Sequence, residues 1–545
     1  MKRIIILNTI FVAFLMLAGC DKYLNDTEIL NIETADNGFT TEAHADQTIV
    51  AIYSNIRNRD GLNGRSAHVL FDAASADMKI IREANAVNNH TFNTNLDDQA
   101  FRNFWQYSYS IIGRCNSSME LVPLTATPEA KISRYNSEAK VVRAIMYYHL
   151  MMAYNTCPLV LKTIPPSDTE GLKKGDATRD EIYTAMIADL EEAIKNTNFP
   201  WEKDIKAAEK GHVGQGTART ILTYLYLTRG WEKNSKTDFE QAKKYAKEII
   251  DLGGFKFEPV LLDAYYKDFS TESIFELAGS NISVGLGSKT TPWFVPLTAF
   301  PGATTDEKKY YGGWYKMAMT QYLYDAIEVG DARKYLLANK NKGNNIWAPK
   351  FLGGDKYGGM KPVLDDVPDN DKGLSTYQCA KGTGAPQEWH DRVSDGDGSG
   401  SCWVIYRLSD VYLLYAEACI KAGGADDEAR TYINKVRERA RNAWTAYLPA
   451  GSPDIPAHPD GIPANIANTV TGDALLAALK NERRIELYAE MKKMIDIRRW
   501  SLGGAKDLEN EVKTFGAWAS KYIWYPKPSD QVDLSQGSVK QNPGY

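Results

Sequence analysis

Apolar positions in this chain recur mostly at helical spacing, in two blocks separated by a long irregular stretch. In the first block, residues Glu138–Tyr154 are apolar nearly all round, which predicts a helix that is buried on every side. Thr178 and, three residues later, Glu181 form a capping-box pattern, which predicts the start of a second helix. Two further helices are expected over Gly216–Thr228 and Phe239–Ile250.

The second block repeats this pattern, with helices expected over Arg407–Lys421, Asp426–Arg441 and Asp473–Trp500. Bulky helices with Tyr and Ala alternate with charged helices that carry Ala at tight positions. This alternation resembles tetratricopeptide-type repeats, whose helix pairs stack because no single pair can bury its apolar face. The pattern therefore predicts a mostly α fold: a degenerate tetratricopeptide-like scaffold of about four units, over residues 100–254 and 403–500.

The stretch between the blocks, residues 255–402, is rich in Gly, Pro, Asp and aromatic residues. Only one helical stretch is expected in it, near Tyr315–Ile327. A second irregular segment covers residues 55–100, and residues 21–40 are polar and predict a strap that precedes the folded body. Loop-rich regions of this length inside a domain usually carry function, so residues 55–100 and 255–402 are the expected binding regions.

The N-terminus has the organisation of a secretory signal. Lys2 and Arg3 precede the mostly apolar segment Ile4–Leu17, which is short for a membrane span and is followed by small residues. Cys20 directly follows Leu-Ala-Gly, which resembles a bacterial lipobox. We therefore expect residues 1–19 to be a lipoprotein signal peptide, Cys20 to be lipidated, and residues 20–545 to form one domain. The alternative is an ordinary signal peptide followed by a structural cysteine.

The composition is that of a folded globular protein, with 43% hydrophobic and 24% charged residues. Removal of residues 1–19 would lower the net charge from -5 to -7, because Lys2 and Arg3 would be lost. A mildly acidic chain without Lys/Arg clusters lacks the electrostatic footprint of a nucleic-acid-binding protein. The chain has 31 Tyr and 12 Trp against 17 Phe, and amphipathic aromatics suit half-exposed binding surfaces as well as large cores.

Five cysteines follow Cys20, an odd number that leaves at least one without an intramolecular partner. Cys379 and Cys402 flank a Gly- and Asp-rich loop, so in an exported protein a disulfide between them is one hypothesis. The other three read as small buried hydrophobes. The chain has no Cys-x-x-Cys motif and its seven His are scattered, so the spacing predicts no zinc site.

Three carboxylates, Glu482, Glu486 and Glu490, recur at every fourth position of the expected helix 473–500. Paired carboxylates can act as general acid and base. Like charges at this spacing repel each other, however, and need cations close by. We therefore expect a structural ion-pair network in the repeat core. The cations expected to supply it are Arg483, Arg484, Arg498, Arg499 and Arg407.

Two short motifs imitate ligand-binding loops. Residues 211–216 contain three glycines, but the preceding sequence is helical and linker-like, so they predict a helix start and not a phosphate cradle. The run Asp395, Asp397 and Ser399 has the alternating oxygens of a calcium loop, whereas Tyr406 occupies the twelfth position in place of a bidentate Glu. A structural calcium and a plain solvated turn both remain open for this run.

Several segments match one known family in order along the chain. The second block contains Arg407–Ala418 (RLSDVYLLYAEA), Glu482–Glu490 (ERRIELYAE) and Asp496–Trp500 (DIRRW), and the tail contains Trp524–Pro528 (WYPKP) and Gln541–Tyr545 (QNPGY). Together with the lipobox and an early Asp, these segments resemble the SusD/RagB-like proteins. The chain departs from the family pattern at Met491–Met494 and at Asp410, where Glu is common, and both departures fall on the scaffold.

The resemblance implies a surface-exposed, lipid-anchored protein of the cell outer membrane. Such a protein would cap a SusC-like TonB-dependent transporter and hand it a nutrient, most often a glycan. No cofactor and no nucleic acid is implied. Alternatives are uptake of a peptide or another non-glycan nutrient, a surface glycoside hydrolase with two facing carboxylates, and a lid that binds no soluble ligand strongly.

Aromatic residues in Gly- and Pro-rich sequence are the expected ligand contacts, because sugars stack their C–H faces on aromatic planes. Polar contacts are expected from the early loop. The alternative is that some of these rings are buried in the loop-rich region itself. The aromatic candidates are Trp293, Tyr310, Tyr311, Trp314, Tyr315, Trp347 and Trp389, and the polar candidates are Asp77, Asn88 and Asn89.

Overall fold

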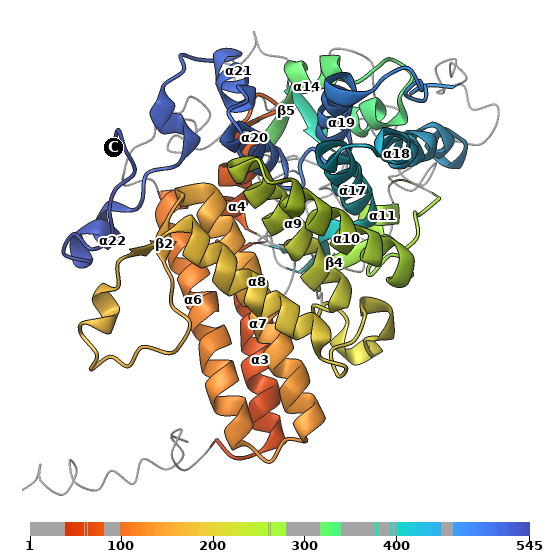
Figure 1. The fold of residues 1–545 in the computed structure, drawn as a ribbon. Coiled ribbons are helices and arrows are strands. Elements are labelled where there is room, and N and C mark those ends of the chain that lie inside the picture. Colours follow the sequence, from red (N-terminus) through yellow and green to blue (C-terminus); the bar gives the residue numbers. More distant parts are fainter. Residues whose placement is uncertain are drawn as a thin grey trace, which may run out of the picture.

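Helices dominate the computed structural model (Figure 1), as the sequence pattern predicts. The structure describes residues 39–58, 60–62, 64–80, 99–259, 261, 263–279, 317–338, 376–379, 393–394, 398–399, 402–447 and 461–545. In the first block, α3 (Glu42–Ile56), α6 (Gln99–Leu121) and α7 (Glu129–Tyr154) run side by side. Helix α7 is buried on all sides over its C-terminal half, as predicted.

The next three helices are α8 (Arg179–Lys195), α9 (Gln215–Lys233) and α10 (Lys236–Leu252). The capping box predicted at the start of α8 is present, since Thr178 accepts from the Glu181 N–H and Glu181 accepts from the Thr178 N–H. Helices α9 and α10 approach closely at Gly230, where a Cβ would lie 2.7 Å from the Phe239 ring. Only glycine fits at that contact.

The second block contains α17 (Leu408–Ala422), α18 (Asp426–Tyr447) and α19 (Gly472–Glu486). Helix α10 packs against α17 although more than 150 residues separate them, and the series α6–α7–α8–α9–α10–α17–α18 packs in chain order. This is the packing expected of stacked helix pairs interrupted once. The mostly helical, tetratricopeptide-like fold class is confirmed. No helix among the described residues is both long and apolar enough to cross a membrane.

The single helix predicted over Asp473–Trp500 is wrong. Helix α19 ends at Glu486, and α20 (Lys493–Leu502) begins after a turn in which Ala489 and Met491 have φ values of 60° and 58°. The Met491 N–H donates to both carboxylate oxygens of Asp72, at 3.0 and 3.1 Å. This long-range contact fixes the turn, so Glu490 does not lie on the helix of Glu482 and Glu486.

Besides two short strand pairs, β2–β3 and β8–β9, two sheets lie among the helices of the described residues. The larger has the order β1–β5–β7–β6, and the smaller pairs β4 (Ser273–Leu277) with β10 (Trp403–Arg407). The helix predicted near Tyr315–Ile327 is therefore only partly correct, because residues 317–320 pair with β1 as a strand before the short α14 (Gln321–Ala326) begins. The strands of the larger sheet are β1 (Met78–Ile80), β5 (Met317–Thr320), β6 (Leu337–Ala338) and β7 (Thr376–Cys379).

Residues 55–100, expected to be irregular, contain buried helical turns: α4 (Arg65–His68) and a π-turn, η1 (Val69–Ala73). The sequence pattern did not predict this burial because the turns carry polar residues. In the fold, buried His68 and Asp72 hydrogen-bond to each other at 2.8 Å. The remaining short elements are η2 (Val122–Leu124), β2 (Cys157–Pro158), η3 (Gly171–Lys173), β3 (Asp176–Ala177), η4 (Glu202–Asp204), η5 (Ala207–Glu209), α11 (Asp263–Tyr266), η6 (Ala332–Leu336), β8 (Val393–Ser394), β9 (Gly398–Ser399), α21 (Asp507–Lys513), η11 (Ser520–Ile523) and α22 (Ser529–Leu534).

Candidate functional site

An ionic network fills the space between α19, α18 and the β4–β10 sheet. At its centre, Glu486 pairs with Arg333 at 3.0 Å, with Arg407 at 2.7 Å and with Arg439. All four side chains are at most 4% exposed. The predicted structural role of the acidic stripe is confirmed, because the central carboxylate is bonded on both oxygens by buried guanidinium groups.

The cations of this network were predicted only in part. Arg407 does join Glu486 to Glu490, with Nε 2.7 Å from the latter. Glu482, however, pairs with Arg333 at 2.5 Å and with Arg437 at 2.6 Å. Arg333 comes from the loop-rich region and Arg437 from α18, so only the folded structure brings them to the stripe.

Of the predicted arginines of α19 and α20, Arg483 and Arg499 pair with neighbouring acids, whereas Arg498 donates to the Met152 carbonyl at 3.0 Å. Arg483 bridges Asp410 at 2.9 Å and Asp496 at 2.7 Å, and Arg499 pairs with Asp496 and Glu417. Burial alone would raise the pKa of Asp496, but Arg483 and Arg499 hold it below its ordinary value. Asp496 is therefore held in its charged form by the two arginines.

Asp77, expected as a polar ligand contact, instead lies in an ion-pair cluster. Its carboxylate accepts from Arg484 Nε at 2.8 Å and lies 3.4 Å from Lys493 Nζ, and the residue is 4% exposed. Burial would raise the pKa of Asp77, but Lys493 and Arg484 lower it below its ordinary value. The structure thus gives Asp77 a role in joining β1 to α19 and α20.

A cavity of about 260 Å³, lined by charged and amide residues together with apolar ones, lies beside this cluster, between α14, α19, α20 and α21. The Tyr322 ring at its edge is 43% exposed and packs under Arg484, whose Cζ is 4.1 Å from the ring centroid. Asn481 and Asn510 also line the cavity. An exposed aromatic face beside amide groups is the combination that sugar recognition requires.

The Gly-rich run 211–216 starts helix α9, as predicted. The Glu202 carboxylate occupies the helix N-terminus, where it accepts from the N–H groups of Gly214, Gly216 and Thr217 at 2.8–3.0 Å. A carboxylate is the charge that a helix N-terminus favours. The position of an incoming anion is thus already filled by a side chain of the protein.

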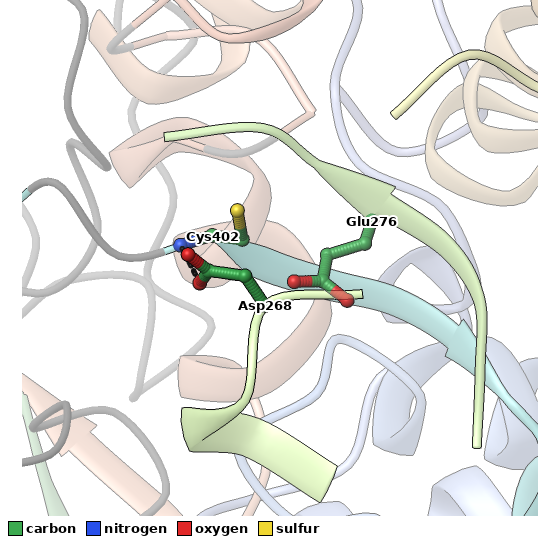
Figure 2. A group of neighbouring side chains, drawn as sticks. All are labelled: Asp268, Glu276 and Cys402. Carbon is green, nitrogen blue, oxygen red and sulfur yellow. Dashed lines mark hydrogen bonds between the residues drawn. The ribbon is translucent and has the colours of Figure 1, made fainter. Parts of the chain in front are cut away.

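A second acidic group lies where β4 ends and β10 begins (Figure 2). One ligand atom each of Asp268, Glu276 and Cys402 lies within 4.8 Å of the other two. Cys402 is a free thiol, so the hypothesised Cys379–Cys402 disulfide is wrong. Cys379 ends β7 in the larger sheet, whereas Cys402 adjoins β10 in the smaller one.

Burial sets the charge state of this group. It raises the pKa of Glu276 to about 7, and it raises the pKa of the Cys402 thiol with the help of the neighbouring carboxylates. Sequence reasoning missed the group, since Cys402 is more than 120 residues from Glu276 and no short motif links them.

Most of the remaining predicted site residues lie outside the described residues. Ser399 lies in β9, which pairs with β8, whereas Asp395 and Asp397 lie outside the described residues. The same holds for Cys20. It also holds for every other predicted ligand contact, namely Trp293, Tyr310, Tyr311, Trp314, Tyr315, Trp347, Trp389, Asn88 and Asn89.

The strand register nevertheless shows where the chain enters or leaves the segments that carry these residues. Ile80, which precedes segment 81–98, pairs with Met317, which follows segment 280–316. Cys379, which precedes segment 380–392, ends β7 on the same side of the sheet. Ala338, which precedes segment 339–375, pairs with Gln378, and because β6 is antiparallel to β7 the chain leaves β6 toward the opposite end. The structure therefore brings the attachment points of the segments with Asn88, Trp314 and Trp389 to one end of the sheet.

Comparison with known proteins agrees with this architecture. Residues 271–545 match the SusD family model, and residues 22–214 match a family described as starch-binding and associating with the outer membrane. The chain is 25% identical to the SusD-like protein P2 of Formosa agariphila, over 98% of this chain and 99% of the relative. A SusD-like protein of Bacteroides ovatus is 22% identical over 75% of this chain and 67% of its own length.

Solved structures show the same fold. A laminarin-binding SusD-like protein aligns with a TM-score of 0.69 at 22% identity, over 93% of this chain and all of the other. Surface glycan-binding protein A from Bacteroides thetaiotaomicron, in complex with laminarihexaose, aligns with a TM-score of 0.70 at 19% identity, over 92% of this chain and all of the other. Since one family model alone matches more than half of its residues, the chain belongs to the SusD family.

Proposed function

We propose that this protein binds a glycan at the cell surface without cleaving it and delivers it to a SusC-like TonB-dependent transporter. Family membership supports outer-membrane association. The glycan class follows from structural neighbours whose names state laminarin or laminarihexaose as ligand. A lipid on Cys20 would hold the protein at the outer membrane, since acyl chains bind membranes by about 0.8 kcal/mol per buried methylene.

The observation that carries the proposal is the register of the β1–β5–β7 ladder. It places the described ends of segments 81–98, 280–316 and 380–392 at one edge of one sheet. These segments carry six of the seven aromatic candidates and both asparagines. A rigid sheet that presents several such segments together suits recognition of an extended ligand by stacking and hydrogen bonds.

Tyr322 offers a second contact at a described position. Its exposed ring adjoins the cavity near Asn481 and Asn510, and Arg484 holds the ring in place. A sugar ring could stack on the open face of Tyr322 while its hydroxyl groups bond to the amides.

Binding without hydrolysis is favoured by the state of the conspicuous carboxylates. A glycoside hydrolase needs two carboxyl groups facing a cleft, about 5 to 9.5 Å apart. Glu482, Glu486 and Glu490 are at most 8% exposed and are bonded to arginines. Carboxylates held in this way stabilise the scaffold and are closed to a substrate.

Affinity electrophoresis of the full chain, purified in detergent, tests the proposal directly. Native gels containing laminarin, starch or other polysaccharides should retard the protein in at least one glycan, and the glycan should keep its length after prolonged incubation. Peptide pools serve as the second ligand class. Retardation by no glycan together with binding of peptides would reject the glycan class, and shortened chains would identify a hydrolase.

A further inference from the structure

Asp268, Glu276 and Cys402 form a compact group of potential metal ligands at the junction of β4 and β10. Figure 2 shows the three side chains gathered over the start of β10. The Cys402 N–H donates to Asp268 at 3.3 Å, and one oxygen or sulfur atom of each side chain lies within 4.8 Å of the others. The three residues therefore converge without any motif in the sequence.

Glu276 shows that the group is incomplete as it stands. The residue is 3% exposed, and its Oε1 accepts from the Phe269 N–H at 3.0 Å. Its Oε2 is buried and has no partner at hydrogen-bonding distance and angle among the described residues. Its polar neighbours are the Ser273 hydroxyl and the Cys402 thiol, both of which act to lower its pKa. Buried carboxylate oxygens are almost always bonded, so an orphaned one points to a missing partner.

The neighbouring cation does not supply that partner. Arg57 lies close enough for its charge to act on Cys402, but its Nη1 donates to the Ala278 carbonyl at 2.6 Å. The Cys402 sulfur accepts from the Gly279 N–H at 3.3 Å.

We propose that Asp268, Glu276 and Cys402 bind a divalent transition-metal cation of the zinc type. A thiolate with two carboxylates is a donor set suited to Zn²⁺, and the thiolate disfavours Ca²⁺ and Mg²⁺, which prefer oxygen. Three protein ligands leave a fourth position of a tetrahedral ion for water. Asp268 is the exposed member of the group, so it lies where water can reach the ion.

The position of the site gives the ion a structural role. Leu277 at the end of β4 pairs with Trp403 at the start of β10. A bound ion would cross-link the ends of these two strands. Because the metal binds the folded arrangement of three distant residues, it should also stabilise the fold.

Calorimetric titration of Zn²⁺ into the chelator-treated full chain, in detergent, tests the site. We expect one equivalent to bind, with affinity more than ~100-fold weaker in Cys402→Ser and Glu276→Gln, because loss of a ligand should exceed the 10- to 100-fold effect of secondary partners. Cys419→Ser is the matched control, since Cys419 is also a free buried thiol beside a carboxylate, Glu428. That variant should bind as the parent does.

Two further readouts keep the test decisive. Co²⁺ in place of Zn²⁺ should give a thiolate-to-metal charge-transfer band that Cys402→Ser removes and Cys419→Ser keeps. Affinity should rise from pH 6 to pH 8, because the metal displaces protons from the thiol and from Glu276. Substitutions at the buried Cys402 and Glu276 could disturb folding. Asp268→Asn is therefore included as a third ligand variant, because Asp268 is exposed. Absence of binding in the folded parent, or a charge-transfer band retained in Cys402→Ser, would overturn the proposal.

Discussion

Two buried acidic clusters in the same half of the molecule differ in how their charges are compensated. Around Glu486, both carboxylate oxygens are bonded by arginines from the loop-rich region, β10 and α18. Around Glu276, by contrast, burial is equally deep but one oxygen lacks a described partner. The carboxylate at the centre of the first cluster has partners for both oxygens, whereas one oxygen of Glu276 has none among the described residues.

Burial of an acidic side chain therefore does not by itself identify its role. Removing one member of a fully bonded ionic network leaves its partners buried without a counter-charge. Such a substitution therefore lowers the free energy of unfolding. A carboxylate whose pKa is raised by burial works against the fold when it is charged. Substitutions should therefore have opposite signs in the two clusters.

The largest effect is expected for Glu486→Ala. Three buried guanidinium groups would lose their shared carboxylate, so the free energy of unfolding should fall by roughly 3 to 5 kcal/mol. Urea denaturation measures this change. Glu438→Ala, at an exposed position of α18, is the control and should leave stability within about 0.5 kcal/mol of the parent. An unchanged midpoint for Glu486→Ala with lost glycan binding would give Glu486 a ligand-binding role.

Glu276→Gln should instead raise the free energy of unfolding, when measured in the presence of a chelator and above neutral pH. The pKa of Glu276 is raised to about 7, so the folded state binds more protons than the unfolded state between pH ~4.5 and ~7, and parental stability falls as pH rises through that window. The variant lacks this loss and should be more stable at pH 8 by up to ~3 kcal/mol, with little difference at pH 5. Denaturation at several pH values measures it. An equal loss of stability at every pH would show that the charge is compensated by the fold.

Asp77→Asn should have an intermediate effect that depends on pH in the reverse sense. The lowered pKa of Asp77 means that its ion pairs stabilise the fold above the ordinary carboxyl pKa, and that this contribution is lost as pH falls below about 4. We expect a loss of about 2 kcal/mol at pH 7, less than for Glu486, because Lys493 keeps Glu511 as a partner. A loss that persists unchanged at pH 3 would contradict the charge-based explanation.

Cys20→Ala should leave the melting temperature unchanged and remove acylation and membrane attachment, because a lipid contributes anchoring and not packing. Membrane fractionation and mass spectrometry of the N-terminus measure the two effects. Stable retention in the outer-membrane fraction without a partner protein would argue against Cys20 as the anchor.

The helices could be predicted because local signals specify them. Periodicity and the Thr178 capping box were sufficient for α7 to α10. The break after Glu486 could not be predicted, since no Gly or Pro marks it and its turn depends on Asp72, more than 400 residues away. Strand β5 was missed for the same reason, because its partner β1 is more than 230 residues away.

The same limit applies to the sites: residues that could be recognised locally were predicted, and partners distant in sequence were not. The acidic stripe was visible in sequence, but its partners Arg333 and Arg439 become neighbours only in the fold. Asp77 was predicted as a ligand contact because a loop acid looks free in sequence, whereas α19 and α20 supply its cations. The Asp268–Glu276–Cys402 group left no periodic or motif signal.

The most direct test of the account compares Trp314→Ala with Glu486→Ala by titration calorimetry, using the glycan selected by affinity electrophoresis, and by melting curves. We assign ligand recognition to the aromatic segments and stability to the ionic core. Trp314→Ala should weaken binding by ~1 to 3 kcal/mol, with a far smaller effect on melting than the 3 to 5 kcal/mol of a core Trp. Glu486→Ala should lower the melting temperature and leave the affinity of the remaining folded protein unchanged. Unfolding of Trp314→Ala, or its binding as the parent does, would contradict the claim and turn attention to Trp347 and Trp389.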